Sequence, residues 1–127
     1  MILKTPKTYL ITLLMTCCLG VAQTGSAAKT FSGEIMDDLC AKNKSHDKMM
    51  QQMKSMGTNS VVCSQKCVEM GAHYVLYDRQ KDAIYKLDNP EKAAPFAGKT
   101  VSISGTLDKN KIKIASIEAT GPAGGAK

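Results

Sequence analysis

Alternating apolar and polar side chains predict five short β-strands in this chain. A period of two residues places successive side chains on opposite faces of a strand, so that one face can be buried. The segments with this pattern are residues 31–36, 73–77, 83–87, 101–104 and 111–117. In the last segment the apolar position moves by one residue, to Ile117, which predicts a bulge near Ala115 or Ser116. The side chains expected to point into the core are those of Val101, Ile103, Ile112 and Ile114.

Two helices are predicted between the first two strands. Ser45 is a typical N-cap residue, so residues 46–56 are expected to be helical. Ser60 is the expected N-cap of a second helix, residues 61–70. Both helices lie within residues 37–72, a segment longer than a strand-to-strand turn needs. The pattern therefore predicts a two-helix insertion between strands 1 and 2.

A shorter helical segment is predicted between the third and fourth strands. It begins at Asn89 and Pro90, a cap residue followed by a first-turn proline, and it ends at Gly98. Five strands with a helix between the third and fourth is the order of an OB-fold barrel. We therefore expect a mainly β, OB-fold-like barrel of five strands, with the two-helix insertion added to it.

Four segments of the sequence carry a resemblance to a group of known proteins. They read "GEIMDDLC", "CVEMGAHYVLYD", "IYKLDNPEKAAPFAGKTVSISGTLD" and "IASIE". With these segments, most of residues 30–119 resembles the small exported OB-fold-like domains of bacteria, whose function is uncharacterised. The resemblance implies an OB-like fold and an exported location. It implies no activity and no catalytic residues.

The beginning of the chain has the pattern of a secretory signal peptide, residues 1–28. Two lysines precede an apolar run, residues 9–22, and small residues at 26–28 form a cleavage site of the A-x-A type. A secreted or periplasmic location is therefore expected. The alternative is a lipoprotein, with Cys17 or Cys18 as the lipidated residue.

The mature chain is expected to be one OB-like domain, residues 29–119, followed by a disordered Gly/Ala-rich tail, residues 120–127. The apolar run near the start has about 14 residues, whereas a membrane-spanning helix needs about 20, so no transmembrane segment is expected. Residues 1–28 contain two lysines and no acidic residue, so their removal lowers the net charge from +6 to +4. This modest charge, together with export, argues against a nucleic-acid partner.

Three cysteines remain in the mature chain, namely Cys40, Cys63 and Cys67. Exported chains meet oxidising conditions, in which cysteines usually pair. A bridge between Cys63 and Cys67 would have to fit the geometry of one helical turn, so it is disfavoured. We therefore expect Cys40 to form a disulfide with Cys63 or Cys67. The remaining thiol would stay reduced, with His73 as its polar neighbour.

A soft-metal site is the alternative use of the same cysteines. On a helix, Cys63 and Cys67 lie one turn apart on the same face, a spacing that places two thiolates on one ion. Cys63 lies near a helix start, where the helix dipole lowers a thiol pKa. Copper or zinc would then be held by Cys63, Cys67 and His73, with Cys40 and His46 as further candidate ligands.

For His46 and the methionines that follow it, the sequence favours structural roles. His46 begins a stripe at helical spacing that continues through Met49, Met50, Met53 and Met56. Such a stripe is compatible with Cu(I) binding, but methionines at this spacing are more typical of a buried packing face. His46 itself is expected to lie near the helix start in contact with solvent.

The sequence offers no support for catalysis. Asp37 and Asp38 are adjacent, so in an extended chain they point to opposite faces, and roles in a turn or at the surface are expected. No nucleophile-elbow serine, phosphate-binding glycine loop or H-E-x-x-H helix occurs. We therefore expect a cell-envelope binding or interaction module without catalytic activity, stabilised by a disulfide. Its partner would be an unknown envelope protein or small ligand.

Overall fold

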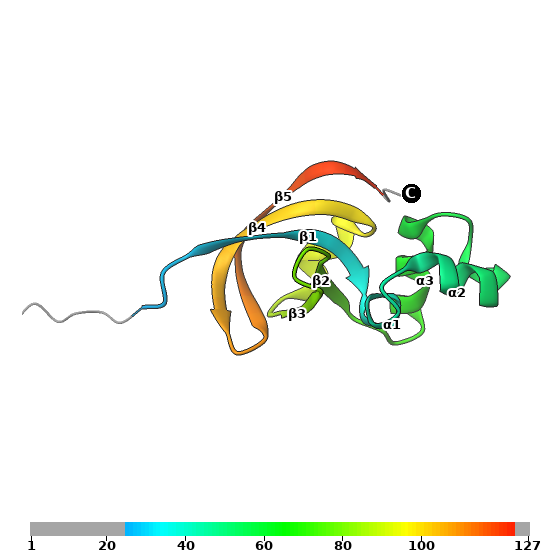
Figure 1. The fold of residues 1–127 in the computed structure, drawn as a ribbon, viewed down its shortest axis with the longest axis horizontal. Helices are drawn as coiled ribbons and strands as arrows, with labels where there is room; N and C mark the ends of the chain where they lie inside the picture. Colours follow the sequence, from blue (N-terminus) through cyan, green and yellow to red (C-terminus); the bar gives the residue numbers. More distant parts are fainter. Residues whose placement is uncertain (1–24, 124–127) are drawn as a thin grey trace, which may run out of the picture.

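The computed structural model describes residues 25–123, which form a five-stranded sheet with helices gathered at one end (Figure 1). The strands are β1 (Lys29–Asp37), β2 (Tyr74–Asp78), β3 (Ala83–Leu87), β4 (Lys99–Asp108) and β5 (Lys111–Ala123). Each overlaps one of the predicted strands, although β2 begins at Tyr74 and leaves out His73, so the prediction of a mainly β domain with five strands is confirmed. The structure makes β1, β4 and β5 longer than the sequence pattern indicated.

The sheet is closed, because each strand is hydrogen-bonded to two others in the order β1-β2-β3-β5-β4. β1 pairs with β2 over its second half and with β4 over its first half, both antiparallel. β3 and β5 run parallel, with Leu87 beside Ile112. This contact joins the β2–β3 hairpin to the β4–β5 hairpin and encloses the space between them.

The predicted bulge in the last strand is confirmed. Ser104 pairs with Ser116, but the next residue, Gly105, pairs with Ile114, so Ala115 is the extra residue. A bulge increases the local twist of the strand that contains it. Gly105 fits this point because a side chain there would collide with the backbone carbonyl of Lys113. The bulge therefore explains why the apolar pattern of β5 changes phase.

Aliphatic and aromatic side chains from every strand fill the interior, and we call this group the sheet core. Its buried members are Phe31, Ile35, Tyr74, Leu76, Leu87, Ala93, Ala97, Val101, Ile103, Ile112 and Ile114. The four inward positions predicted on the last two strands are all among them. The 3-10 helix η2 (Pro90–Phe96) lies between β3 and β4. Ala93 belongs to η2, and Ala97 directly follows it. The predicted short helix is therefore present, although Asn89 makes no side-chain cap to it.

The insertion between β1 and β2 holds more helices than predicted. They are α1 (Asp38–Lys42), α2 (His46–Gln52), the 3-10 helix η1 (Lys54–Met56) and α3 (Ser60–Glu69). The prediction of one helix over 46–56 was wrong, because the backbone at Met53 is extended (φ −131°, ψ 92°) and separates α2 from η1. Ser45 caps α2 as expected. α3 is capped by Asn59 rather than Ser60, because the side chain of Asn59 accepts a hydrogen bond from the backbone amide of Val62 at 2.9 Å.

Helix α1 was absent from the sequence prediction. It begins because the Asp37 carboxylate accepts the backbone amide of Cys40 at 2.8 Å, the bond of an N-cap. Asp37 is the last residue of β1, so the strand passes directly into the helix. This junction sets the position of Cys40.

The C-terminal prediction needs a correction as well. β5 continues to Ala123, which pairs with Lys99 of β4, so a disordered tail beginning at residue 120 was wrong for residues 120–123. The remaining tail, and most of the predicted signal peptide with Cys17 and Cys18, lie outside the described residues. Within residues 25–123, none of the helices has the length and apolar character needed to cross a membrane.

Candidate metal centre

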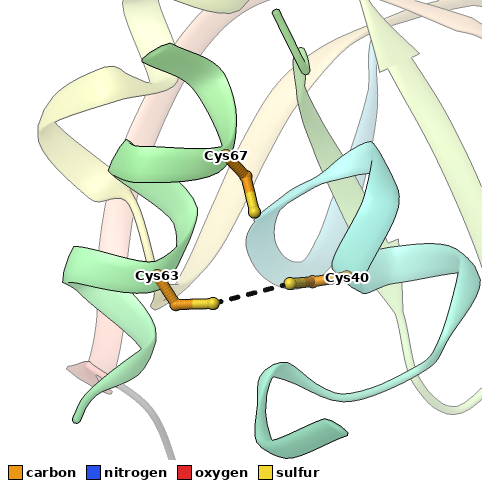
Figure 2. Close-up of side chains that lie close together, drawn as sticks. All are labelled: Cys40, Cys63 and Cys67. Carbon is orange, nitrogen blue, oxygen red and sulfur yellow. Dashed lines mark hydrogen bonds between the residues drawn. The ribbon is translucent and has the colours of Figure 1, made fainter. Parts of the chain in front are cut away.

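Three cysteines from two helices meet inside the insertion. Cys40 comes from α1, and Cys63 and Cys67 lie one turn apart on α3, with their sulfurs directed toward α1 (Figure 2). The three sulfurs lie within 4.8 Å of one another, and all three residues are fully buried. The Sγ atoms of Cys40 and Cys63 are 3.7 Å apart. The fold thus brings thiols separated by more than 20 residues into one cluster.

These cysteines belong to a second packed group, which we call the insertion core. Its buried members are Met36, Cys40, Ala41, Met56, Cys63, Cys67, Val75 and Tyr77. Met49 and Met50 pack against it, whereas Met53 is 40% exposed. The predicted packing role of the methionine stripe is therefore confirmed for Met56 and in part for Met49 and Met50. It was wrong for Met53, where the helix breaks.

A second group of donor atoms shares Cys40 with the first. The ligand atoms of Asp37, Cys40 and His46 also lie within 4.8 Å of one another. His46 is only 6% exposed, so the expectation that it lies in contact with solvent was wrong. Asp37 has the structural role that was one of its two expected roles, as the cap of α1, but it is fully buried and not at the surface. The cause is the tight junction between β1 and α1, together with the packing of α2 against α3.

Two polar atoms of this second group have no hydrogen-bond partner. Asp37 uses Oδ1 to cap α1, while its Oδ2 is buried and unpaired. His46 Nε2 lies 3.0 Å from Glu34 Oε1, and because a carboxylate only accepts, Nε2 is the donor. His46 Nδ1 is buried and unpaired. Buried polar atoms without partners are rare in folded proteins, so each of these two needs an explanation.

Glu34 holds the imidazole of His46 in place from the sheet. It lies on β1 and also accepts a 3.0 Å bond from the guanidinium of Arg79. Burial alone raises the pKa of this carboxyl, but the hydrogen bonds and charges of His46 and Arg79 outweigh burial and hold the pKa below 4.5. Glu34 therefore stays an anionic acceptor for His46 Nε2 over the neutral range.

The three thiols are held in the protonated form by their surroundings. Burial is the largest cause and raises the pKa of Cys40, of Cys63 and of Cys67, the last to about 12. The negative charge of Asp37 raises all three further. The prediction of a lowered pKa at Cys63 was wrong, because the fourth residue of α3 is buried, and desolvation outweighs the helix dipole.

The disulfide expected from the sequence is not formed in this structure. Cys40, Cys63 and Cys67 are free thiols, and the 3.7 Å between the sulfurs of Cys40 and Cys63 exceeds the bond length of about 2.05 Å. These two cysteines are nevertheless one of the two expected pairs. A Cys40–Cys63 bridge therefore stays a prediction, which would require the two sulfurs to approach each other.

The structure places His73 away from the cysteine cluster. His73 is exposed just before β2, and its backbone amide donates to Asp38 Oδ1 at 3.2 Å. It lines a surface hollow with Lys42 and Lys86, and among the described residues neither donor group includes it. Of the two histidines named from the sequence, the fold brings only His46 beside a thiol.

Sequence reasoning missed Glu34 and Asp37 as parts of the site. A signal existed for Asp37, because an aspartate three residues before Cys40 is a typical N-cap and would have predicted α1. Glu34 gave no signal, since it is one polar position in an alternating strand. Its partner His46 is 12 residues away in sequence, and only the fold shows that they meet.

Comparisons with protein-family models, with curated proteins and with solved structures found no match to this chain. The resemblance to exported OB-fold-like domains therefore stays a prediction.

Proposed function

We propose that this chain is a soft-metal-binding domain, which holds Zn²⁺ or Cu⁺ through the thiolates of Cys40, Cys63 and Cys67. The observation that carries the proposal is the convergence of three buried sulfurs within 4.8 Å. Two sulfurs that each lie about 2.3 Å from a tetrahedral zinc ion are about 3.8 Å apart. The 3.7 Å between the sulfurs of Cys40 and Cys63 is close to that separation.

The unpaired atoms beside the thiols also favour a cation. Leaving a buried polar atom unsatisfied costs about 1–3 kcal/mol. Asp37 Oδ2 and His46 Nδ1 both carry this cost without a ligand. An ion that either atom coordinates would remove the penalty of that atom. Thiolates are soft ligands that select zinc and Cu(I) over magnesium or calcium, which prefer oxygen.

The protonation state of the cluster fits a site that is completed by its metal. Without an ion, burial keeps the thiols protonated, so that no thiolate is left uncompensated in the interior. An incoming ion would displace these protons, and binding would then stabilise the fold. Buried sites made of protein ligands are typical of structural or carrier functions rather than of catalysis. We therefore propose a metal-binding module without enzymatic activity.

We further propose that the scaffold is an OB-fold-like barrel and that the protein is exported. Support for the barrel comes from the closed strand order, the parallel β3–β5 pair and the helix between β3 and β4. Support for export comes from the signal-like pattern of residues 1–28. In that location the domain would bind an envelope protein or a small ligand, and the cysteine site favours a metal ion as the ligand.

The direct test is an anaerobic metal titration of reduced, metal-free protein. Zn²⁺ and Cu⁺ are each added in competition with a chromophoric chelator, and bound metal is measured by elemental analysis. We expect one ion per chain. Cys63→Ser should lower the affinity more than about 100-fold, because a lost ligand weakens binding more than the 10–100-fold effect of a lost outer partner.

The matched control is Gln65→Ala, an exposed position on the same helix, which should bind like the parent. Circular dichroism checks that each variant is folded. A folded, reduced parent that binds neither ion would refute the proposed function.

The second candidate is an interaction module stabilised by a Cys40–Cys63 disulfide, with Cys67 left as a free thiol. The short distance between the first two sulfurs favours it. The two candidates exclude each other, because a sulfur joined in a disulfide is no longer a thiolate ligand. Peptide mapping by mass spectrometry of protein from the oxidising compartment, with thiols blocked at lysis, distinguishes a bridged pair from three free thiols.

A further inference from the structure

Three thiolates leave one position of a tetrahedral zinc ion without a ligand. Structural zinc sites are almost always four-coordinate, and Cys₃His is one of their common donor sets. The donor group that shares Cys40 offers two residues for the fourth position, His46 and Asp37. Each has one buried atom without a hydrogen-bond partner, His46 Nδ1 and Asp37 Oδ2.

The hydrogen bonds of His46 favour its imidazole as the fourth ligand. Histidines that bind metal usually donate their other ring N–H to a carboxylate, which fixes the tautomer and the ring orientation. His46 already has this arrangement, because its Nε2 donates to Glu34 Oε1 at 3.0 Å. A ligand imidazole has to be neutral, and with Nε2 donating to Glu34 its free lone pair would be on Nδ1, the buried atom without a partner.

Asp37 is the weaker candidate for the fourth position. Its Oδ1 is committed to the amide of Cys40 at 2.8 Å, which holds α1 and fixes the direction of the carboxylate. A fourth anionic ligand would add its charge to three thiolates in a buried site, whereas a neutral imidazole adds none. Asp37 Oδ2 is therefore not assigned to the ion.

We propose that the resident ion is Zn²⁺ in a Cys₃His site, with Cys40, Cys63, Cys67 and His46 Nδ1 as ligands and Glu34 as the positioning residue. This inference rests on the proposed metal-binding function. His46 is the first residue of the short helix α2, which packs against α3. Because His46 shares a donor group with Cys40 but not with Cys63 and Cys67, α2 would have to move toward α3 for the site to close. Arg79 in turn holds the second oxygen of Glu34 at 3.0 Å.

The choice of zinc gives a differential prediction. Cu(I) is satisfied by soft sulfur donors, so three thiolates are enough to hold it, whereas zinc takes nitrogen and sulfur together in four-coordinate sites. His46→Ala should therefore lower zinc affinity at least about tenfold and leave Cu(I) affinity unchanged. Equal losses for both ions, or no loss for zinc, would overturn the role of His46.

X-ray absorption at the zinc edge identifies the ligands of the parent protein without any substitution. We expect three sulfurs at about 2.3 Å and one nitrogen at about 2.0–2.1 Å, with the multiple scattering of an imidazole. The imidazole signal should disappear in His46→Ala. Bound zinc without an imidazole signal in the parent overturns the inference but leaves metal binding intact. Absence of bound zinc and Cu(I) instead overturns the proposed function itself.

Glu34 needs a test that separates positioning from simple packing. Glu34→Gln keeps the size of the side chain and should weaken zinc binding about 10–100-fold, as expected for an outer partner of a ligand. The imidazole signal should remain, and Cu(I) affinity should be unchanged. An unchanged zinc affinity in a folded Glu34→Gln protein would overturn the positioning role. Asp37→Asn is the companion variant, and we expect it to keep the imidazole signal as well.

Discussion

The sheet core and the insertion core contain different kinds of side chain. The sheet core is aliphatic and aromatic, with residues such as Ile35, Leu76 and Ile103 at zero exposure. The insertion core contains three thiols and two buried methionines, and buried Asp37, His46 and Ser64 lie in the same part of the chain. Among the described residues, the buried side-chain atoms without partners all belong to these last three residues.

The difference indicates which of the two cores has partners for all its buried groups without a ligand. Burial of aliphatic surface stabilises a core without any further partner, at about 25 cal/mol for each Å². A core that holds unpaired polar atoms and protonated thiols loses part of that gain until something binds them. We therefore expect the sheet core to respond to changes in packing and the insertion core to respond to metal, oxidation and pH.

The largest effect should follow a charge placed in the sheet core. Ile103→Asp buries an unpaired carboxylate at a position with zero exposure, and it should leave the domain unfolded at room temperature. Thr100→Lys, on the exposed side of the same strand and opposite Glu34, is the control and should melt no lower than the parent. Circular dichroism melts measure both. An Ile103→Asp protein that melts like the parent would contradict the assignment of this core.

Zinc should stabilise the reduced protein through the insertion core. At a free zinc concentration about 1,000 times the dissociation constant, binding adds about 4 kcal/mol. For a domain of this size, that raises Tm by roughly 15–30 °C. Chelator should reverse the shift, and Cys63→Ser should remove most of it. If zinc leaves Tm unchanged, the insertion core does not gain stability from a bound metal ion, and the expectation is wrong.

Oxidation should stabilise the metal-free protein to a similar or slightly smaller extent. A bridge between Cys40 and Cys63 closes a loop for which chain entropy predicts about 3.5 kcal/mol. Reductant should lower the Tm of oxidised parent, and Cys40→Ser should abolish the difference between the oxidised and reduced forms. Cys67→Ser is the matched control and should keep the difference. If oxidised Cys40→Ser still melts above its reduced form, another pair forms the bridge.

Alkaline pH should weaken the metal-free protein. Burial raises the pKa of the Cys67 thiol from 9.0 to about 12, so the unfolded chain loses this proton first as the pH rises. The stability due to the protonated thiol is full below pH 9 and is lost progressively toward pH 12. At pH 10 the loss is about 1 kcal/mol for this thiol.

The measurement for this effect is the urea midpoint at pH 8 and at pH 10, for the parent and for Cys67→Ser. The midpoint of the parent should fall more, because lysines and tyrosines titrate equally in both proteins. Equal falls would contradict a raised thiol pKa.

How much could be predicted from the sequence differs between the same two regions. The sheet core follows a period of two residues, so Ile103, Ile112 and even the bulge at Ala115 were predictable. The insertion was harder, because its contacts are not periodic. The extended backbone at Met53 breaks a stripe that suggested one continuous helix, and the burial of His46 depends on Glu34 in a distant strand.

The candidate site could be predicted only in part for the same reason. The residue types and the α-helical spacing of Cys63 and Cys67 were visible in the sequence. The position of Cys40 was not predicted, although the Asp37 cap that begins α1 left a signal for it in the sequence. His73 has the same spacing from Cys67 as His46 has from Cys40, so spacing alone gave no reason to prefer His46.

The release of protons on zinc binding tests the central claim most directly, because only thiolate coordination requires the buried thiols to ionise. Reduced, metal-free protein at pH 7 is mixed with one equivalent of zinc, and released protons are measured by calorimetry in buffers of different ionisation enthalpy. We predict about three protons for each bound ion, one from each cysteine. Zinc that binds with no proton release, or that fails to bind, would contradict the account.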